Sequence, residues 1–263
     1  MPGSDRSTGD GTAARLVALS VDAQDPLRLA RVWAAALRWE VGAATDDEVG
    51  LVPTDGTRFG IVFRRVAEPK VGKSRIHLDL TTSSLDDQRD SVAQLVALGA
   101  RPIDIGQRPD EEHVVLADPE GNELCLIEPG NSFLAGCDRL GALSCDGTRA
   151  VGLFWSAALG WPLVWDQDEE TAIRDPDGTG PLITWGGLPL PPKVGRNRLR
   201  LDIAPTDGTD QRAEVDRLVA LGATPADIGH RPAGGVGLTD PDGNELCLLP
   251  APAARRGQEA AAS

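Results

Sequence analysis

The spacing of apolar residues changes repeatedly along the chain between two positions and about 3.6 positions. Residues 16–21 alternate as in a strand, and residues 26–38 then place apolar side chains at helical spacing. Three further strand-like segments follow, separated by Gly and Asp: 39–44, 48–53 and 58–66. This pattern predicts a β-α-β-β-β unit.

The same order of elements is predicted for the next part of the chain. A strand at 75–81 precedes a helix at about 85–98, for which Ser84 is a suitable N-cap and Gly99 a suitable stop. The strands that complete this unit are predicted at 101–104, 112–117 and 122–128. The last two are joined by Asp-Pro-Glu-Gly-Asn, whose Pro and Gly suit a tight turn.

A long internal repeat indicates that this organisation occurs twice. Residues 69–80 return as 192–203, and residues 118–126 return as 240–248, at offsets of 123 and 122. A period this long exceeds that of a solenoid repeat, so each copy is predicted to be a domain-sized module. The predicted fold class is α+β, with helices on one face of mostly antiparallel sheet. We expect a disordered tail at 1–13, modules at 14–130 and 138–252, a linker at 131–137 and a second tail at 253–263.

Composition limits the partners and the location that can be expected. Lys and Arg number 26 and Asp and Glu number 40. The net charge of −14 disfavours nucleic acid and anionic membranes, because both bind cationic side chains. No apolar run approaches the roughly 18 residues of a membrane helix, and the first ten residues lack the apolar segment of a signal peptide. The four cysteines form no CxxC pair, so we expect a cytoplasmic protein with free thiols.

Two segments carry a resemblance to a known superfamily. The strand Arg-Ile-His-Leu-Asp-Leu at 75–80 and the repeated turn and strand Asp-Pro-Glu/Asp-Gly-Asn-Glu-Leu-Cys-Leu resemble the vicinal oxygen chelate superfamily, which includes glyoxalase I, extradiol dioxygenases and bleomycin resistance proteins. Residues 63–80 resemble its glyoxalase-like branch in particular. The resemblance implies that each module curls its sheet into a half-open bowl, with helices outside and a ligand inside. It also implies that the two modules pack together within one chain, which would be a monomer or a homodimer.

The resemblance also implies where metal ligands would stand. Family members take one ligand from the first strand, one from the strand that opens the second half, and one from the last strand. In the two copies these positions are Leu16 and Leu140, His77 and Arg200, and Cys125 and Cys247. Every combination of positions contains a leucine, which cannot ligate, and at most a histidine and a cysteine remain. Catalytic divalent sites normally need three protein ligands, so we predict no metal and no cofactor.

Strand alternation predicts which side chains line each bowl. In 75–80 the apolar side chains should pack on the helix, which leaves the polar ones facing the cavity. The first bowl is then predicted to contain Ser20, Arg75, His77, Asp79, Glu123 and Cys125. The second is predicted to contain Ser144, Arg198, Arg200, Asp202, Glu245 and Cys247. Trp165 and Trp185 occur only in the second copy, where they either form an aromatic wall for the ligand or fill the core.

Two roles remain open for the polar residues of the bowls. Arg75, Asp79 and Glu123 have equivalents in the second copy, which favours an ion-pair network that braces the sheet. His77 is replaced by Arg200 in the second copy and is the side chain of that face that titrates near neutral pH. It is therefore the candidate general acid or base, and a purely hydrogen-bonding histidine is the alternative.

Three functions follow from these residues. The first is binding or sequestration of a small, partly apolar molecule in a sheet-lined cavity, without a catalytic metal. The second is a metal-free lyase, isomerase or cyclase that uses His77 as acid or base. The third, a divalent-metal glyoxalase or dioxygenase, is disfavoured by the missing ligands.

Overall fold

The computed structural model describes residues 13–108, 111–206 and 208–251, and the predicted tails, Ala13 apart, lie outside this part of the chain. The described chain forms four successive β-α-β-β-β units, as the periodicity predicted. The first unit consists of β1 (Arg15–Ala23), α1 (Pro26–Leu37), β2 (Glu40–Ala44), β3 (Glu48–Val52) and β4 (Gly60–Arg65). The second consists of β5 (Ile76–Leu80), α2 (Leu85–Ala97), β6 (Arg101–Pro102), β7 (Val114–Ala117) and β8 (Glu123–Leu126).

The second module repeats this order. Its first unit consists of β9 (Leu140–Cys145), α3 (Arg149–Leu159), β10 (Leu163–Gln167), β11 (Glu170–Ile173) and β12 (Leu182–Trp185). Its second unit consists of β13 (Leu199–Ala204), α4 (Gln211–Ala220), β14 (Thr224–Pro225), β15 (Val236–Thr239) and β16 (Glu245–Leu248). The two tandem modules match the predicted α+β class with half-open sheets.

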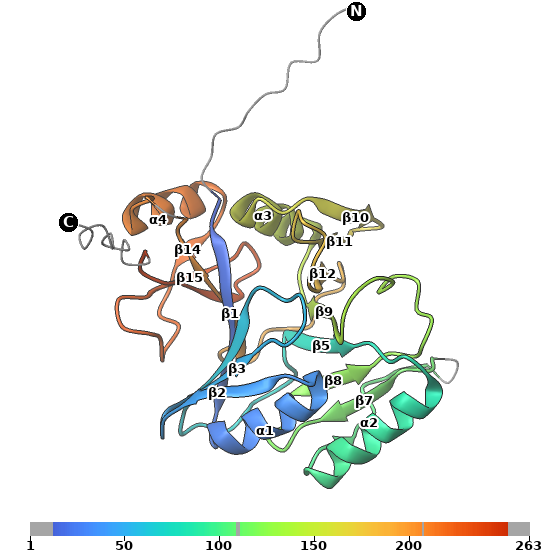
Figure 1. The fold of residues 1–263 in the computed structure, drawn as a ribbon. Helices are drawn as coiled ribbons and strands as arrows, with labels where there is room; N and C mark the ends of the chain where they lie inside the picture. Colours follow the sequence, from blue (N-terminus) through green and yellow to red (C-terminus); the bar gives the residue numbers. More distant parts are fainter. Residues whose placement is uncertain (1–12, 109–110, 207, 252–263) are drawn as a thin grey trace, which may run out of the picture.

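The strands form two eight-stranded sheets, and each sheet contains one unit from each module (Figure 1). Sheet A has the order β14-β15-β16-β13-β1-β4-β3-β2, with β1 antiparallel to β13 at its centre. Sheet B has the order β10-β11-β12-β9-β5-β8-β7-β6, with β5 antiparallel to β9 at its centre. Residues at equivalent positions of the two modules therefore lie in different sheets, and each inner face is assembled from both halves of the chain.

Apolar side chains on the outer face of each sheet pack against the helices. Ile76, Leu78 and Leu80 are buried in the core, as the alternation of this strand predicted. Ser84 caps α2 by accepting a hydrogen bond from the backbone N–H of Asp87. Gly99 follows the helix with a φ of +101°, a conformation that glycine adopts without strain. In Figure 1, α1 lies beside α2 below the sheets and α3 beside α4 above them.

The opposite face of each sheet, which we call the inner face, carries most of the polar strand residues. One prediction about this face is wrong. Leu16, at the first-strand position where the resemblance places a metal ligand, would point inward by strand alternation, but a register shift in β1 between Leu16 and Ala18 turns its side chain into the hydrophobic core. Among the described residues, no helix is both long enough and apolar enough to cross a membrane.

Candidate functional site

Four side chains from three adjacent strands meet on the inner face of sheet B. His77 and Asp79 are two residues apart on β5 and point to the same face, with His77 Nε2 lying 3.4 Å from Asp79 Oδ1. Ser144 on β9 lies opposite His77 and donates its hydroxyl hydrogen to Asp79. Cys125 on β8 lies opposite Asp79. We call these four residues the sheet B cluster.

The electrostatics of the sheet B cluster keep Asp79 ionised. Burial alone would raise the pKa of this carboxyl group, but hydrogen bonds from His77, Ser144 and Cys125 and the charge of the imidazole lower it overall. Burial and the neighbouring charge of Asp79 raise the pKa of the Cys125 thiol, so the thiol is protonated at neutral pH. The His77 side chain is 23% exposed, so a ligand can reach the imidazole.

The equivalent place in sheet A is occupied by a buried arginine. Arg200 stands where the first module has His77, and its side chain is 1% exposed. Its Nη1 lies 3.0 Å from Asp22 Oδ1, and its Nη2 donates to the backbone carbonyl of His230 at 2.8 Å. This guanidinium is therefore held by the protein itself and fills its part of the inner face.

A second arginine completes the network in sheet A. Arg64 on β4 donates hydrogen bonds to the Ser20 hydroxyl and to Asp202 Oδ2, the latter at 2.9 Å. Ser20 donates to the same carboxylate. Burial raises the pKa of Asp202, and the charges of Arg64 and Arg200 oppose this effect only in part. These buried groups pair with one another and so form, in sheet A, an ion-pair network of the kind that the sequence favoured for bracing the sheet.

Sheet B has no arginine at the position equivalent to Arg64. In sheet A, β1 and β4 pair in parallel, with Ser20 opposite Val62 and Asp22 opposite Arg64. In sheet B, β9 and β12 pair in the same register, with Ser144 opposite Thr184, so the residue two positions further on, Gly186, is equivalent to Arg64. A Cβ atom added at Gly186 would meet no other atom within 4 Å. The inner face of sheet B thus carries a glycine and an imidazole where sheet A carries two guanidinium groups.

The structure changes the predicted partners of the serines. Ser20 was expected in one cavity with His77, but it lies in sheet A opposite Arg200 and bonds to Asp202. Ser144 lies beside His77 instead. The reason is the pairing of β1 with β13 and of β9 with β5, which exchanges the half-modules between the sheets.

The two tryptophans proposed to wall the second bowl have different environments. Trp185 is 1% exposed and belongs to the hydrophobic core, so it does not line the inner face. Trp165 is 37% exposed and makes an edge-to-face contact with Phe133, with ring centroids 5.9 Å apart. Both rings line a cavity of about 400 Å³ together with Ser132, Val164, Arg174 and Leu182.

This cavity and the sheet B cluster lie on the same face of sheet B. Leu182 of the cavity lies opposite Ala142, and Ala142 lies opposite Asp79. At about 4.8 Å between neighbouring strands, the backbone of Leu182 is about 10 Å from that of Asp79. An apolar cavity and a polar, titratable cluster are thus neighbours.

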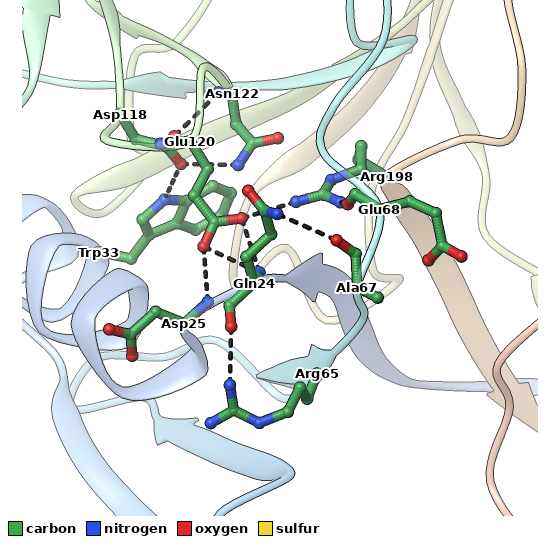
Figure 2. Close-up of polar contacts among 10 residues, drawn as sticks. All are labelled: Gln24, Asp25, Trp33, Arg65, Ala67, Glu68, Asp118, Glu120, Asn122 and Arg198. Atoms are coloured by element: carbon green, nitrogen blue, oxygen red, sulfur yellow. Dashed lines mark hydrogen bonds and ion pairs between the residues drawn. The ribbon is translucent and has the colours of Figure 1, made fainter.

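Three of the residues predicted to line the bowls, Glu123, Glu245 and Arg198, hold the turns that precede β5 and β13. Glu123 Oε1 lies 2.9 Å from Lys70 Nζ, and Glu245 Oε1 lies 2.7 Å from Lys193 Nζ. Arg198 donates to the carbonyl of Glu68 and to Glu120 Oε2, as Figure 2 shows. Among the residues that the structure describes, neither Glu123 nor Glu245 has an ion pair with an arginine, so the expected Arg–Asp–Glu network does not include them.

Two further predicted residues stand apart from the sheet B cluster. Arg75 lines a cavity between the turns at 69–75 and 192–198. Cys247 is fully buried beside Asp202, and burial with that negative charge raises the pKa of its thiol to about 11. The thiol is therefore protonated at neutral pH, as that of Cys125 is.

Three residues of the sheet B cluster have donor atoms close enough for a metal ion. One atom each of His77, Asp79 and Cys125 lies within 4.8 Å of the other two. The ligand count made from the sequence omitted Asp79, because that residue is not one of the three family positions. Asp79 is already bonded to Ser144, and the Cys125 thiol would have to lose a proton of raised pKa before it could ligate. As arranged, the His77 imidazole and the second carboxylate oxygen of Asp79 are the two donors that need no rearrangement, whereas a catalytic divalent site needs three, so we expect these residues not to hold a resident catalytic cation.

Sequence reasoning missed the residues that distinguish the two sheets. Arg64, Gly186 and Phe133 were not singled out, and Thr184, whose hydroxyl lies 3.3 Å from that of Ser144, was not considered either. The repeat contained a usable signal, because aligning the two copies along β4 and β12 pairs Arg64 with Gly186. Phe133 lies in the segment predicted to be a linker, where no strand pattern assigns a face.

Comparison with known proteins identifies the family. The sequence profile described as "Glyoxalase-like domain" matches twice, at residues 18–127 and 141–249. No curated protein matches the chain. The crystal structure of glyoxalase I from Zea mays superposes with a TM-score of 0.61 at 14% identity, over 90% of this chain and 92% of that one.

Two other crystal structures give the same result. A point mutant of the maize enzyme superposes with a TM-score of 0.59 at 16% identity, over 90% of this chain and 94% of that one. A Bacillus subtilis protein provisionally described as a dioxygenase has a TM-score of 0.59 at 13% identity, over 90% and 86% of the two chains. At these identities the superpositions show the shared fold alone. The two profile matches establish that the chain belongs to the glyoxalase-like domain family, within the vicinal oxygen chelate superfamily, with two tandem domains.

Proposed function

We propose that this protein binds a small, partly apolar molecule on the inner face of sheet B, without a catalytic metal. The observation that carries the proposal is the difference between equivalent positions of the two sheets. In sheet A these positions carry Arg64 and Arg200, whose guanidinium groups are paired within the protein, whereas in sheet B they carry Gly186, which has space beside its Cα, and the partly exposed His77. A protein that needed both inner faces only for bracing would gain nothing from this difference.

The neighbouring cavity supports the choice of a partly apolar ligand. Its volume of about 400 Å³ is within the range of small-molecule sites, roughly 300 to 1,000 Å³. Phe133 and Trp165 supply aromatic surface, and Arg174 adds one cationic group at the cavity. The ligand would place an apolar part in this cavity and a hydrogen-bonding part near His77 and Thr184.

Filling the open face should abolish binding. Gly186→Arg introduces the arginine that sheet A has at the equivalent position, and Val219→Arg on the exposed surface of α4 is the control for added charge. The probe is 8-anilinonaphthalene-1-sulfonate, whose fluorescence rises in apolar cavities, and native mass spectrometry is used to search for a co-purified compound. We expect Gly186→Arg to lose probe binding while Val219→Arg retains it. Equal binding by both variants, with unchanged circular dichroism, would reject the site.

The absence of a catalytic metal is tested separately. The protein is purified without chelators and its metal content is measured by plasma mass spectrometry. We expect less than one tenth of an equivalent of any transition metal. A stoichiometric ion that His77→Ala releases would contradict this part of the proposal.

A second candidate function, metal-free proton transfer, is favoured by the pairing of His77 with Asp79. A carboxylate beside an imidazole fixes the orientation of the ring and stabilises its protonated form, as a general acid or base requires. Asp79 suits this role because its pKa is lowered, so it is ionised at neutral pH.

Hydrogen exchange at carbon tests the second candidate. Small ketones and keto acids are incubated with the protein in D₂O, and loss of the α-proton signal is followed by NMR. We expect exchange by the wild type and none above the buffer rate by His77→Gln, with probe binding retained by both. No exchange by the wild type with any of these compounds would leave binding as the function.

A further inference from the structure

A cationic cavity lies between two turns of nearly the same sequence, 69–75 and 192–198. It measures about 30 Å³, enough for a small ionic group or two waters. Its lining includes a single carboxylate, that of Asp146. The cationic residues of the lining are Lys70, Lys73, Arg75, Lys193, Arg196 and Arg198. This concentration of positive charge is unexpected in a chain with a net charge of −14.

Five of these six cations have a carboxylate partner. The pairs and their N–O distances are Lys70–Glu123 at 2.9 Å, Lys193–Glu245 at 2.7 Å, Arg198–Glu120 at 2.6 Å, Arg196–Asp227 at 3.3 Å and Lys73–Asp146 at 3.8 Å. Within the described part of the chain, no carboxylate or other acceptor partners Arg75. Its side chain is nine-tenths buried, and its Nε and Nη2 are inaccessible and without an acceptor. A buried, unpaired guanidinium is strongly unfavourable, so an acceptor is missing from this place.

Arg198 is the residue of the second copy that is equivalent to Arg75, and its partners show which acceptor Arg75 lacks. Glu120 accepts hydrogen bonds from the backbone N–H groups of Gln24 and Asp25 and still reaches Arg198, as Figure 2 shows. The residue equivalent to Glu120 in the second copy is Asp242. Asp242 accepts from the backbone N–H of Thr148, which is equivalent to the bond from Gln24.

Asp242 makes no contact with Arg75 that corresponds to the ion pair between Glu120 and Arg198. Its side chain is one methylene shorter than that of Glu120, which accounts for the loss of reach. The second carboxylate oxygen that pairs with Arg198 in one copy is thus absent beside Arg75 in the other.

Two neighbouring donors of the same cavity are also without acceptors. Ser74 Oγ and Asn197 Nδ2 are buried and have no hydrogen-bond partner among the described residues. Both side chains follow the turn glycines at equivalent positions of the two copies. Three residues of the cavity lining, from both modules, therefore have donors without an acceptor.

We propose that this cavity binds a small oxyanion, the carboxylate or phosphate group of a metabolite or the free ion, with Arg75 as its principal ligand. An anion would supply the acceptor that Asp242 does not reach, and Ser74 and Asn197 would donate to its remaining oxygens. Charge-assisted hydrogen bonds of this kind are the strong ones in proteins. The site is independent of the sheet B cavity and of the function proposed for it.

The proposal is tested with inorganic phosphate and with acetate as probes. Binding to the full chain is measured by isothermal titration calorimetry at constant ionic strength, for wild type, Arg75→Gln and Asp242→Glu. We expect one probe ion per chain, and binding roughly 10- to 100-fold weaker for Arg75→Gln, because one or two charge-assisted hydrogen bonds are lost. Asp242→Glu should lose binding to the same extent, because the longer side chain then occupies Arg75.

A matched variant of the other copy strengthens the test. Glu120→Asp removes the methylene that lets Glu120 reach Arg198, which lines the same cavity, so it should strengthen binding of the probe ion without changing the stoichiometry. If phosphate alone binds, the natural ligand is a phosphate; if acetate competes with it, a carboxylate is also accepted. Unchanged binding in Arg75→Gln, unchanged binding in Asp242→Glu, or no binding of either probe by the wild type would overturn the proposal. Asp242→Glu keeps the test decisive if Arg75→Gln does not fold.

Discussion

Replacement of Arg64 by methionine should destabilise the protein strongly at neutral pH and only weakly in acid. Arg64 Nη1 lies 2.9 Å from Asp202 Oδ2, and Asp202 is completely buried. Removing one partner of a buried ion pair typically costs about 3 to 5 kcal/mol, because a buried charge is left without compensation. We expect the lower end of this range, about 3 kcal/mol, because Ser20 still donates to the carboxylate and Arg200 remains nearby.

The pH dependence follows from the direction of the pKa shift. Burial raises the pKa of Asp202 in the folded protein above its unfolded value of about 3.9, and loss of the Arg64 charge should raise it further. A raised pKa stabilises the fold below about 3.9, and that contribution is lost as the pH rises through the folded pKa. In acid the carboxyl group is protonated with or without Arg64, so the cost of the substitution should shrink.

Urea unfolding of the wild type and Arg64→Met at pH 7.5 and at acid pH measures both effects. The double-mutant cycle with Asp202→Asn isolates the pair, and Arg65→Met, at an exposed neighbouring position, is the control. A loss of less than about 1 kcal/mol in unfolding free energy at pH 7.5 would mean that the Arg64–Asp202 pair contributes no more than an ordinary surface ion pair. An equal cost at both pH values would show that Asp202 does not carry the effect. Either result would remove the contrast on which the binding proposal rests.

The duplicated architecture supplies a second pair of matched substitutions, and the cysteines supply a further prediction. Trp33 Nε1 donates to Asp118 at 2.9 Å, whereas the equivalent bond of Trp155 is 3.4 Å long. Trp33→Phe should therefore destabilise the protein by about 1.5 to 3 kcal/mol and Trp155→Phe by less, as measured by urea unfolding. Equal costs would show that the shorter bond of Trp33 is not the stronger one. Of the four thiols, Cys137 alone is not buried, so Ellman's reagent should label one thiol in the native protein, and Cys137→Ser should abolish this labelling. Native labelling of Cys125 would contradict its burial and its raised pKa.

The order of helices and strands was predictable because each element has a local cause. The apolar spacing of α1 and the Ser84 cap and Gly99 stop of α2 act over a few neighbouring residues. The repeat then extends the same assignment to the second module. These interactions do not depend on which strands become neighbours.

The pairing of strands across modules was not predictable in the same way. The strand β1 can pair with β5 or with β13, and both candidates present an alternating apolar face with the same Leu-Asp step. A local pattern cannot separate two partners that are copies of one another. The exchange of Ser20 and Ser144 follows from this single ambiguity. The choice between cavity wall and core for Trp185 could not be made from the sequence, because a shift of one residue in a strand moves a side chain to the other face.

The difference between the inner faces also depends on the tandem arrangement. Arg64 comes from the first module and Arg200 from the second, and both lie in sheet A because the half-modules are exchanged. A symmetric dimer of either module alone would contain two identical sheets, so an arginine at the first position would enter both inner faces. Joining the modules in one chain lets each position change independently. One sheet can then carry internally paired arginines while the other retains a partly exposed imidazole beside an apolar cavity.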